Sequence, residues 1–277
     1  MTDPQFQRYE VVPNDPKAVL IIVHGIAEHG GRYRHVAEAL AHEDIACLVY
    51  DQRGHGANPG TRTHIDDFTQ FAKDLECIGQ AAAKQFPGLA LFVWGHSMGS
   101  VVVMLAAIDG LQWARGIITS GCALDALPKL DGLVGGALKI GTALLPRLRI
   151  SLRIDATTLT QVREVQQRHM SDPLVPRTAS LKLLYGFALA CRKCRLQALK
   201  ITLPWLAVHG EADAVCPVSG SRALISAIAS QDKRLVTYPK LLHEIHNEDE
   251  GARAVFFELM TCWILERAKG YTVPGIL

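Results

Sequence analysis

The sequence of 277 residues lacks any apolar run long enough to cross a membrane. A spanning helix needs about 20 such residues, whereas the longest apolar region is interrupted by Lys139 and Pro146. The first residues, Met-Thr-Asp-Pro, also lack the basic and apolar segments of a secretory signal. We therefore expect a chain that neither spans a bilayer nor is secreted.

An excess of one charge and a pattern of paired cysteines are lacking as well. The 29 basic and 27 acidic residues leave a net charge of +2, so no global field favours a nucleic-acid partner. Seven scattered cysteines indicate reduced thiols in a cytoplasm and no disulfide. Cys191 and Cys194 have Cys-x-x-Cys spacing, but no second pair lies nearby to complete a zinc site. Two neighbours on one helix face explain that spacing, and we expect no metal.

What the chain does contain is a regular alternation of strand-like and helix-like segments. Short β-branched and apolar runs predict buried strands at residues 18–23, 45–50, 89–94, 116–120, 204–208 and 234–238. Apolar residues at helical spacing predict helices at 33–42, 67–86, 98–108, 218–229 and 251–267. This order predicts an α/β fold, a mostly parallel central sheet with helices on both faces. Residues 6–12 are expected to add an antiparallel edge strand.

Residues 123–199 break this alternation, with helical stretches but no convincing core strand. We interpret them as an inserted, mainly helical cap on a core formed by residues 1–122 and 200–277. An apolar stripe within the cap either lines a channel for a fatty chain or packs the cap on the core. Its members are Leu133, Val134, Ala137, Leu138, Ile140, Leu144, Leu145 and Leu148. Residues 147–154 alternate polar and aliphatic side chains, which favours a solvated edge strand, with contact to a membrane surface as the alternative.

The segment Gly95-His96-Ser97-Met98-Gly99 follows an apolar run and precedes a predicted helix. This is the context of a nucleophile elbow, in which a serine sits on a cramped turn between strand and helix. Glycines on either side allow neighbouring backbone to approach closely. The motif predicts Ser97 as the nucleophile.

A serine hydroxyl needs a base to take its proton and a carboxylate to orient that base. In this fold the acid and then the histidine follow the serine in the chain. Asp213 lies just past a predicted strand end and is our acid, with Glu211 and Asp125 as alternatives. His243 lies on a loop after the last predicted strand and is our base, with His246 as its competitor.

The transition state also requires two backbone N–H groups directed at the developing oxyanion. Met98, directly after the nucleophile, is expected to supply the first. The glycine-containing loop after the first core strand is expected to supply the second through Ile26, which follows Gly25. The glycines of this loop also fit a plain flexible loop.

Three motifs together resemble a known family: His24-Gly25-Ile26-Ala27-Glu28-His29, Tyr50-Asp51-Gln52-Arg53-Gly54-His55-Gly56 and Gly95-His96-Ser97-Met98-Gly99-Ser100. They look like the monoacylglycerol lipase and lysophospholipase-like branch of the α/β-hydrolases. The resemblance implies the α/β-hydrolase fold, a Ser97, Asp213 and His243 triad, an oxyanion hole from Ile26 and Met98, and release of glycerol and fatty acid from monoacylglycerols. It further implies that Glu28, Arg32 and His246 hold the glycerol end. Ile26 departs from the family, which usually has a smaller residue there.

The sequence thus predicts a serine carboxylester hydrolase that forms an acyl-enzyme and requires no metal or organic cofactor. A lysophospholipase, or another hydrolase of small acyl esters, thioesters or peptides, is the alternative on the same fold. A non-catalytic binding protein is disfavoured because nucleophile, base and acid are all present. The expected partner is a monoacylglycerol or similar single-chain ester, with transient membrane-surface contact through the cap and no required protein partner.

Overall fold

A computed structural model describes residues 6–127, 130 and 132–270 and shows a seven-stranded sheet in the order β1-β3-β2-β4-β5-β8-β9. Its strands are β1 (Arg8–Val11), β2 (Ala18–Val23), β3 (Ile45–Tyr50), β4 (Ala90–His96), β5 (Ala114–Ser120), β8 (Trp205–Gly210) and β9 (Lys233–Tyr238). β1 pairs antiparallel with β3, and the remaining neighbours are parallel. The predicted α/β-hydrolase fold and its antiparallel edge strand are confirmed.

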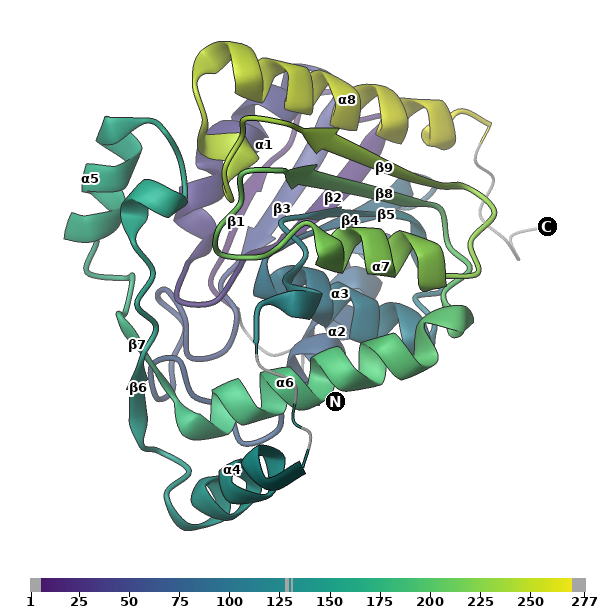
Figure 1. Cartoon of the computed structure of the whole chain (residues 1–277). Helices are drawn as coiled ribbons and strands as arrows, with labels where there is room; N and C mark the ends of the chain where they lie inside the picture. The colour runs from purple at the N-terminus through teal and green to yellow at the C-terminus, as the bar shows by residue number, and fades with distance from the viewer. Residues whose placement is uncertain (1–5, 128–129, 131, 271–277) are drawn as a thin grey trace.

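Helices cover both faces of this sheet, which is why its central strands are mostly apolar. One face carries α1 (Arg34–Ala41) and α8 (Glu250–Ala268), and the other carries α2 (Thr69–Gln85), α3 (Met98–Asp109), α6 (Leu181–Gln197) and α7 (Ser219–Ala227) (Figure 1). Every residue of β2, β3, β4 and β8 is buried. The buried apolar side chains form two clusters, one for each face.

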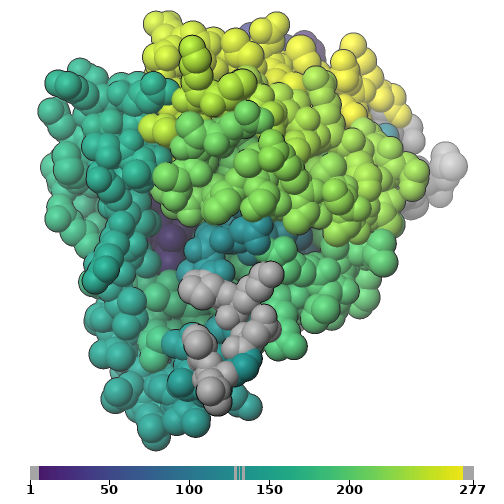
Figure 2. Space-filling model, in the orientation of Figure 1, coloured from purple at the N-terminus to yellow at the C-terminus, as the bar shows by residue number. Residues whose placement is uncertain are grey.

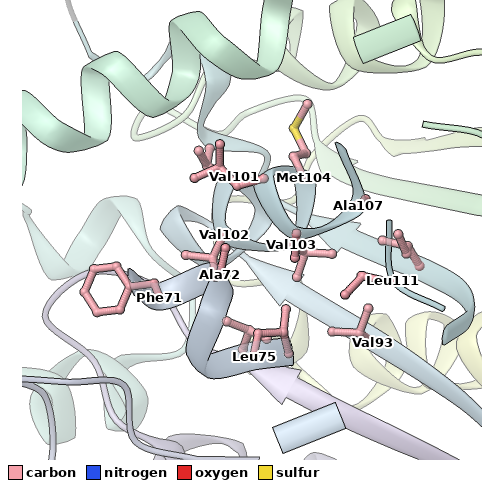
Figure 3. Packing of buried hydrophobic residues seen from close by; sticks show 14 of the residues in the cluster. Phe71, Ala72, Leu75, Val93, Val101, Val102, Val103, Met104, Ala107 and Leu111 are labelled. Atoms are coloured by element: carbon pink, nitrogen blue, oxygen red, sulfur yellow. The ribbon is translucent and has the colours of Figure 1, made fainter. Parts of the chain in front are cut away.

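Helix α3, which begins directly after Ser97, is buried on all sides from Met98 to Ile108. A helix that is apolar around its whole circumference belongs in the middle of a core. Val102 and Val103 lie near Leu75 of α2 and Val93 of β4 (Figure 3). This packing fixes the helix that follows the predicted nucleophile.

Residues 123–199 add no strand to the seven-stranded sheet within the described part of the chain. They form α4 (Gly132–Leu144), α5 (Arg163–Ser171) and α6, together with a small antiparallel pair, β6 (Arg149–Ser151) and β7 (Thr178–Ser180). The alternating segment therefore contains a strand, but the sequence did not reveal its three-residue partner. Figure 2 shows much of residues 123–199 as the teal side of the molecule, with a hollow between them and the yellow-green C-terminal part. Helix α6 packs against α3 of the core.

The apolar stripe of the cap is largely solvent-facing, which differs from both predicted arrangements. Ile140, Leu144, Leu145 and Leu148 are between 48% and 74% exposed, so they neither pack on the core nor line an enclosed channel. The side chains of Leu133 and Val134 lie outside the described residues. No helix in the described ranges is both long and apolar enough to cross a membrane.

Candidate active site

Ser97 sits on the sharp turn between β4 and α3, with φ of 52° and ψ of −121°. Positive φ is unfavourable for a residue with a side chain, and such strain concentrates at functional sites. The turn is closely packed, since a Cβ on Gly95 would lie 2.5 Å from the Gly99 oxygen. A Cβ on Gly99 would lie 2.1 Å from the Val23 oxygen. Both glycines of the motif are therefore required by backbone contact.

Asp213 and His243 meet at the carboxyl ends of neighbouring strands β8 and β9. His243 Nδ1 lies 2.7 Å from Asp213 Oδ2. The other oxygen, Asp213 Oδ1, accepts hydrogen bonds from the backbone amides of Val215 and Cys216, each at 2.8 Å. The carboxylate is thus held in place while it orients the imidazole.

His209 is a further neighbour of this carboxylate that the sequence analysis did not identify. Its Nε2 lies 3.1 Å from Asp213 Oδ2, and its Nδ1 lies 2.7 Å from Ser221 Oγ. The sequence feature that could have identified His209 is its position four residues before Asp213, at the end of a buried strand.

The two members of the acid-base pair shift each other's pKa. Burial disfavours the charged form of Asp213, but the positive charge of His243 and hydrogen bonds from His209, His243 and the Cys216 amide outweigh it and lower the pKa of Asp213. Burial likewise lowers the pKa of His243, and the Asp213 carboxylate outweighs this effect and raises it. The pair therefore favours an imidazolium beside an ionised carboxylate.

The Ser97 hydroxyl lies beside this pair but forms no hydrogen bond with His243 within the described residues. Its oxygen is 4.0 Å from Cys216 Sγ. The His243 ring borders Gly121, which follows the Ser120 carbonyl that accepts the Ser97 amide at 3.0 Å. Catalytic hydrogen bonds of this type often tighten only when substrate binds.

The loop after β2 lies against the nucleophile. A Cβ on Gly25 would approach Ser97 Cβ to 3.0 Å, which places the next residue, Ile26, close to the elbow. The backbone amides of Ile26 and Met98 donate to no protein acceptor among the described residues. Free N–H groups at this position are what an oxyanion requires.

The alternative acids and the alternative base are engaged elsewhere. Glu211 Oε1 lies 3.3 Å from an Arg222 nitrogen, and Asp125 Oδ2 accepts from Ser219 Oγ at 2.6 Å. The His246 ring has no exposed surface and stacks on Tyr33, with ring centroids 4.9 Å apart. None of these three side chains pairs with His243 or Asp213 in the described structure.

The residues expected to hold the glycerol end contact one another instead. Arg32 donates to both oxygens of Glu244 at 2.8 Å and lies 3.1 Å from Glu28 Oε2. The side chains of Arg32 and Glu28 are only 9% and 7% exposed, and Glu244 was not predicted. The fully buried ring of His246 cannot touch a substrate in this conformation.

Glu28, His96 and Glu244 are the described group whose ligand atoms lie close enough to suggest a metal, all within 4.8 Å of one another. Zinc and magnesium bind such ligands at about 2.0–2.2 Å. The Arg32 guanidinium already lies between the two carboxylates, so the position of a cation is taken by a side chain. This cluster therefore fits an internal ion pair better than a metal site.

Comparison with known proteins agrees with this geometry. The family model described as serine aminopeptidase S33 matches residues 14–250. The monoacylglycerol lipase of Mycolicibacterium smegmatis is 33% identical over 255 residues, which cover 91% of this chain and 89% of that protein. The monoglyceride lipase of Homo sapiens is 32% identical over 266 residues, which cover 95% and 87%.

A solved structure extends the similarity to three dimensions. The crystal structure of Paleococcus ferrophilus monoacylglycerol lipase has a TM-score of 0.82 and 25% sequence identity, and it covers 95% of this chain and 99% of that one. The chain therefore belongs to the serine aminopeptidase S33 family of hydrolases, and its similarity to monoacylglycerol lipases extends over nearly its whole length.

Proposed function

We propose that this hydrolase cleaves monoacylglycerols to a fatty acid and glycerol through an acyl-enzyme on Ser97. Ser97 Oγ attacks the ester carbonyl carbon while His243 takes its proton, and the same proton then passes to the departing glycerol oxygen. Asp213 stabilises the imidazolium, and the Ile26 and Met98 amides bind the oxyanion. Water, activated by His243, then releases the fatty acid.

The observation that carries this proposal is the 2.7 Å contact between Asp213 and His243 beside a serine on a strained turn. The relatives named monoacylglycerol lipase support the choice of ester. Glu28 and Arg32 retain small exposed surfaces with which to border the glycerol end, and we assign His246 a supporting position behind them.

A substrate has to pass the proposed cap, residues 123–199, to reach Ser97. Ser97 and His243 are only 5% and 3% exposed, so a substrate must enter between cap and core. A cavity of about 310 Å³ is lined by Ala27, next to Ile26, by apolar residues that include Leu152, Ile154 and Val175, and by the charged residues Arg153, Asp155 and Arg177. We propose that the acyl ester approaches along its apolar part, because apolar surface stabilises a fatty chain by roughly 0.8 kcal/mol per methylene.

The decisive assay offers purified enzyme monoacylglycerol, lysophosphatidylcholine and triacylglycerol side by side. We expect monoacylglycerol to give the highest kcat/KM, and Ser97→Ala to abolish hydrolysis of all three while retaining the fold. Ser219→Ala, at an exposed serine whose hydroxyl donates to Asp125, serves as control. Faster turnover of lysophosphatidylcholine would favour the lysophospholipase alternative, and an active Ser97→Ala variant would exclude the mechanism.

We also propose a cytoplasmic enzyme that contacts membrane surfaces transiently through α4. The exposed Leu144 and Leu145 support the membrane contact, since such side chains insert readily into an interface. The cytoplasmic location is supported by the seven cysteines, all of which are free thiols. Sedimentation with phosphatidylcholine vesicles tests it: Leu144→Asp with Leu145→Asp should reduce binding. Leu199→Asp, at an equally exposed leucine of the 3-10 turn after α6, should leave vesicle binding unchanged. Equal vesicle binding by all variants would contradict the contact.

A further inference from the structure

A cavity of about 400 Å³ lies where the cap helix α5 meets the core helix α1 and the start of α8. Figure 1 shows α5 beside these two elements. Basic side chains dominate its lining: Arg32, Arg34, Arg168, Arg253, His29, His35 and His169. None of the proposed triad lines it, and Arg32 is the one residue that it shares with the proposed glycerol-binding group.

Part of this positive charge is balanced within the protein. Arg32 pairs with the buried Glu28 and Glu244, as described above. Arg34 Nε lies 2.8 Å from Glu38 Oε1. These arginines leave no charge for a ligand to neutralise.

Arg168 and Arg253 are different, because neither has a carboxylate partner among the described residues. The one side-chain hydrogen bond of Arg168 runs from its Nε to the Glu164 carbonyl at 3.3 Å. The other acid of the lining, Asp172, lies 2.8 Å from His29 Nε2. Two uncompensated positive charges thus face one cavity.

These two charges converge on the same region. Arg168 and Arg253 line the same cavity as His35. Burial lowers the pKa of His35, its hydrogen bond with the His246 carbonyl raises it, and the charges of the two arginines lower it. Next to Arg168 on α5, His169 also lines the cavity, and its buried Nδ1 has no hydrogen-bond partner within the described residues. A buried polar atom without a partner is costly unless a ligand or water satisfies it.

We propose that this cavity binds a phosphate monoester, held by Arg168 from the cap, Arg253 from the core and an imidazole nitrogen of His169. A phosphate monoester carries a charge of about −1.5 to −2 at pH 7, which matches the two uncompensated arginines. Guanidinium groups form paired hydrogen bonds with phosphate oxygens. Because its ligands come from α5 and α8, the bound anion restrains the cap against the core.

Binding is measured by titration calorimetry and thermal unfolding at fixed ionic strength, with glycerol 3-phosphate as the soluble probe. Vesicles containing phosphatidic acid, compared with pure phosphatidylcholine vesicles, present the same group on a lipid. We expect at least one of these two probes to bind and to raise the unfolding temperature. Arg168→Gln with Arg253→Gln should weaken that binding by at least about tenfold.

The matched control is the pair Arg192→Gln with Arg163→Gln, which removes the same charge from exposed arginines outside the cavity and should bind as the wild type does. Butyrate, a singly charged anion, should bind at least about tenfold more weakly than the phosphate probe. Absence of binding by both phosphate probes would overturn the proposal, as would unchanged binding by the Arg168 and Arg253 variant or butyrate binding of equal strength. All readouts are independent of ester hydrolysis, so they are separate from the test of the proposed function.

Discussion

Asp213 Oδ2 lies 2.7 Å from His243 Nδ1, and the two residues belong to loops that follow adjacent parallel strands. Parallel strands bring their carboxyl ends to one edge of a sheet, so residues 30 positions apart become neighbours without a long connection. Asp213 is further fixed by two backbone amides. The contact is therefore part of the fold rather than a chance meeting of surface side chains.

Replacing Asp213 by asparagine should lower kcat by about 10³–10⁴, because the neutral amide neither stabilises the imidazolium nor holds the productive tautomer. The variant should fold, since the amide has nearly the same shape. Steady-state hydrolysis of a monoacylglycerol measures the effect. Glu211→Gln, at the alternative acid, should stay within about twofold of the wild type; similar losses in both variants would contradict the assignment.

The pH dependence of kcat/KM should report His243. Its pKa is raised above the ordinary 6.5 because the Asp213 carboxylate outweighs the effect of burial. The free base is the active form, so activity should be present above this raised pKa and be lost as pH falls through it. A stopped assay between pH 5 and 9 measures the midpoint, and a midpoint below 6.5 would contradict the expected shift. In Asp213→Asn the midpoint should move to lower pH.

The positions of the strands could be predicted from the sequence, and the triad could be proposed from it, because both rest on local signals. Buried parallel strands are continuous apolar runs, and the elbow requires glycines at fixed spacing around Ser97. The acid and the base follow from their order along the chain. The boundaries shift by one or two residues, as for β4, which extends through His96.

The polar cluster beneath the site could not be predicted, because its members meet through long-range packing. Glu244 lies 212 residues after Arg32 in the chain, and no spacing rule joins them. Helical spacing in the cap was equally ambiguous: it identified an apolar stripe but not that Leu144 would face solvent. A stripe records which side of a helix is apolar and not what covers it.

Arg32 should be far more important for stability than its neighbour Arg34. Arg32→Met leaves Glu28 and Glu244 buried without a cation, and breaking a buried pair in this way costs about 3–5 kcal/mol. Arg34→Met removes an exposed pair with Glu38, and its unfolding midpoint should remain close to that of the wild type. Urea unfolding followed by circular dichroism compares the two; equal midpoints would show that the cluster is not a stabilising ion pair.

Gly99 and Gly136 form a second matched pair. A Cβ on Gly99 would lie 2.1 Å from the Val23 oxygen and 2.7 Å from the His24 oxygen. Both contacted atoms are backbone oxygens, which cannot rotate away as a side chain would, so Gly99→Ala must push β2 and the elbow apart.

A Cβ on Gly136, in the exposed helix α4, meets nothing within 4 Å. Gly136→Ala should therefore raise stability by about 0.5–1 kcal/mol through helix propensity. Gly99→Ala should lower the unfolding temperature, and a displacement of Ser97 by about 1 Å should reduce hydrolysis by about 10²-fold. Thermal unfolding and a monoacylglycerol assay measure both effects, and a Gly99→Ala enzyme with wild-type stability and activity would refute the close packing of the elbow.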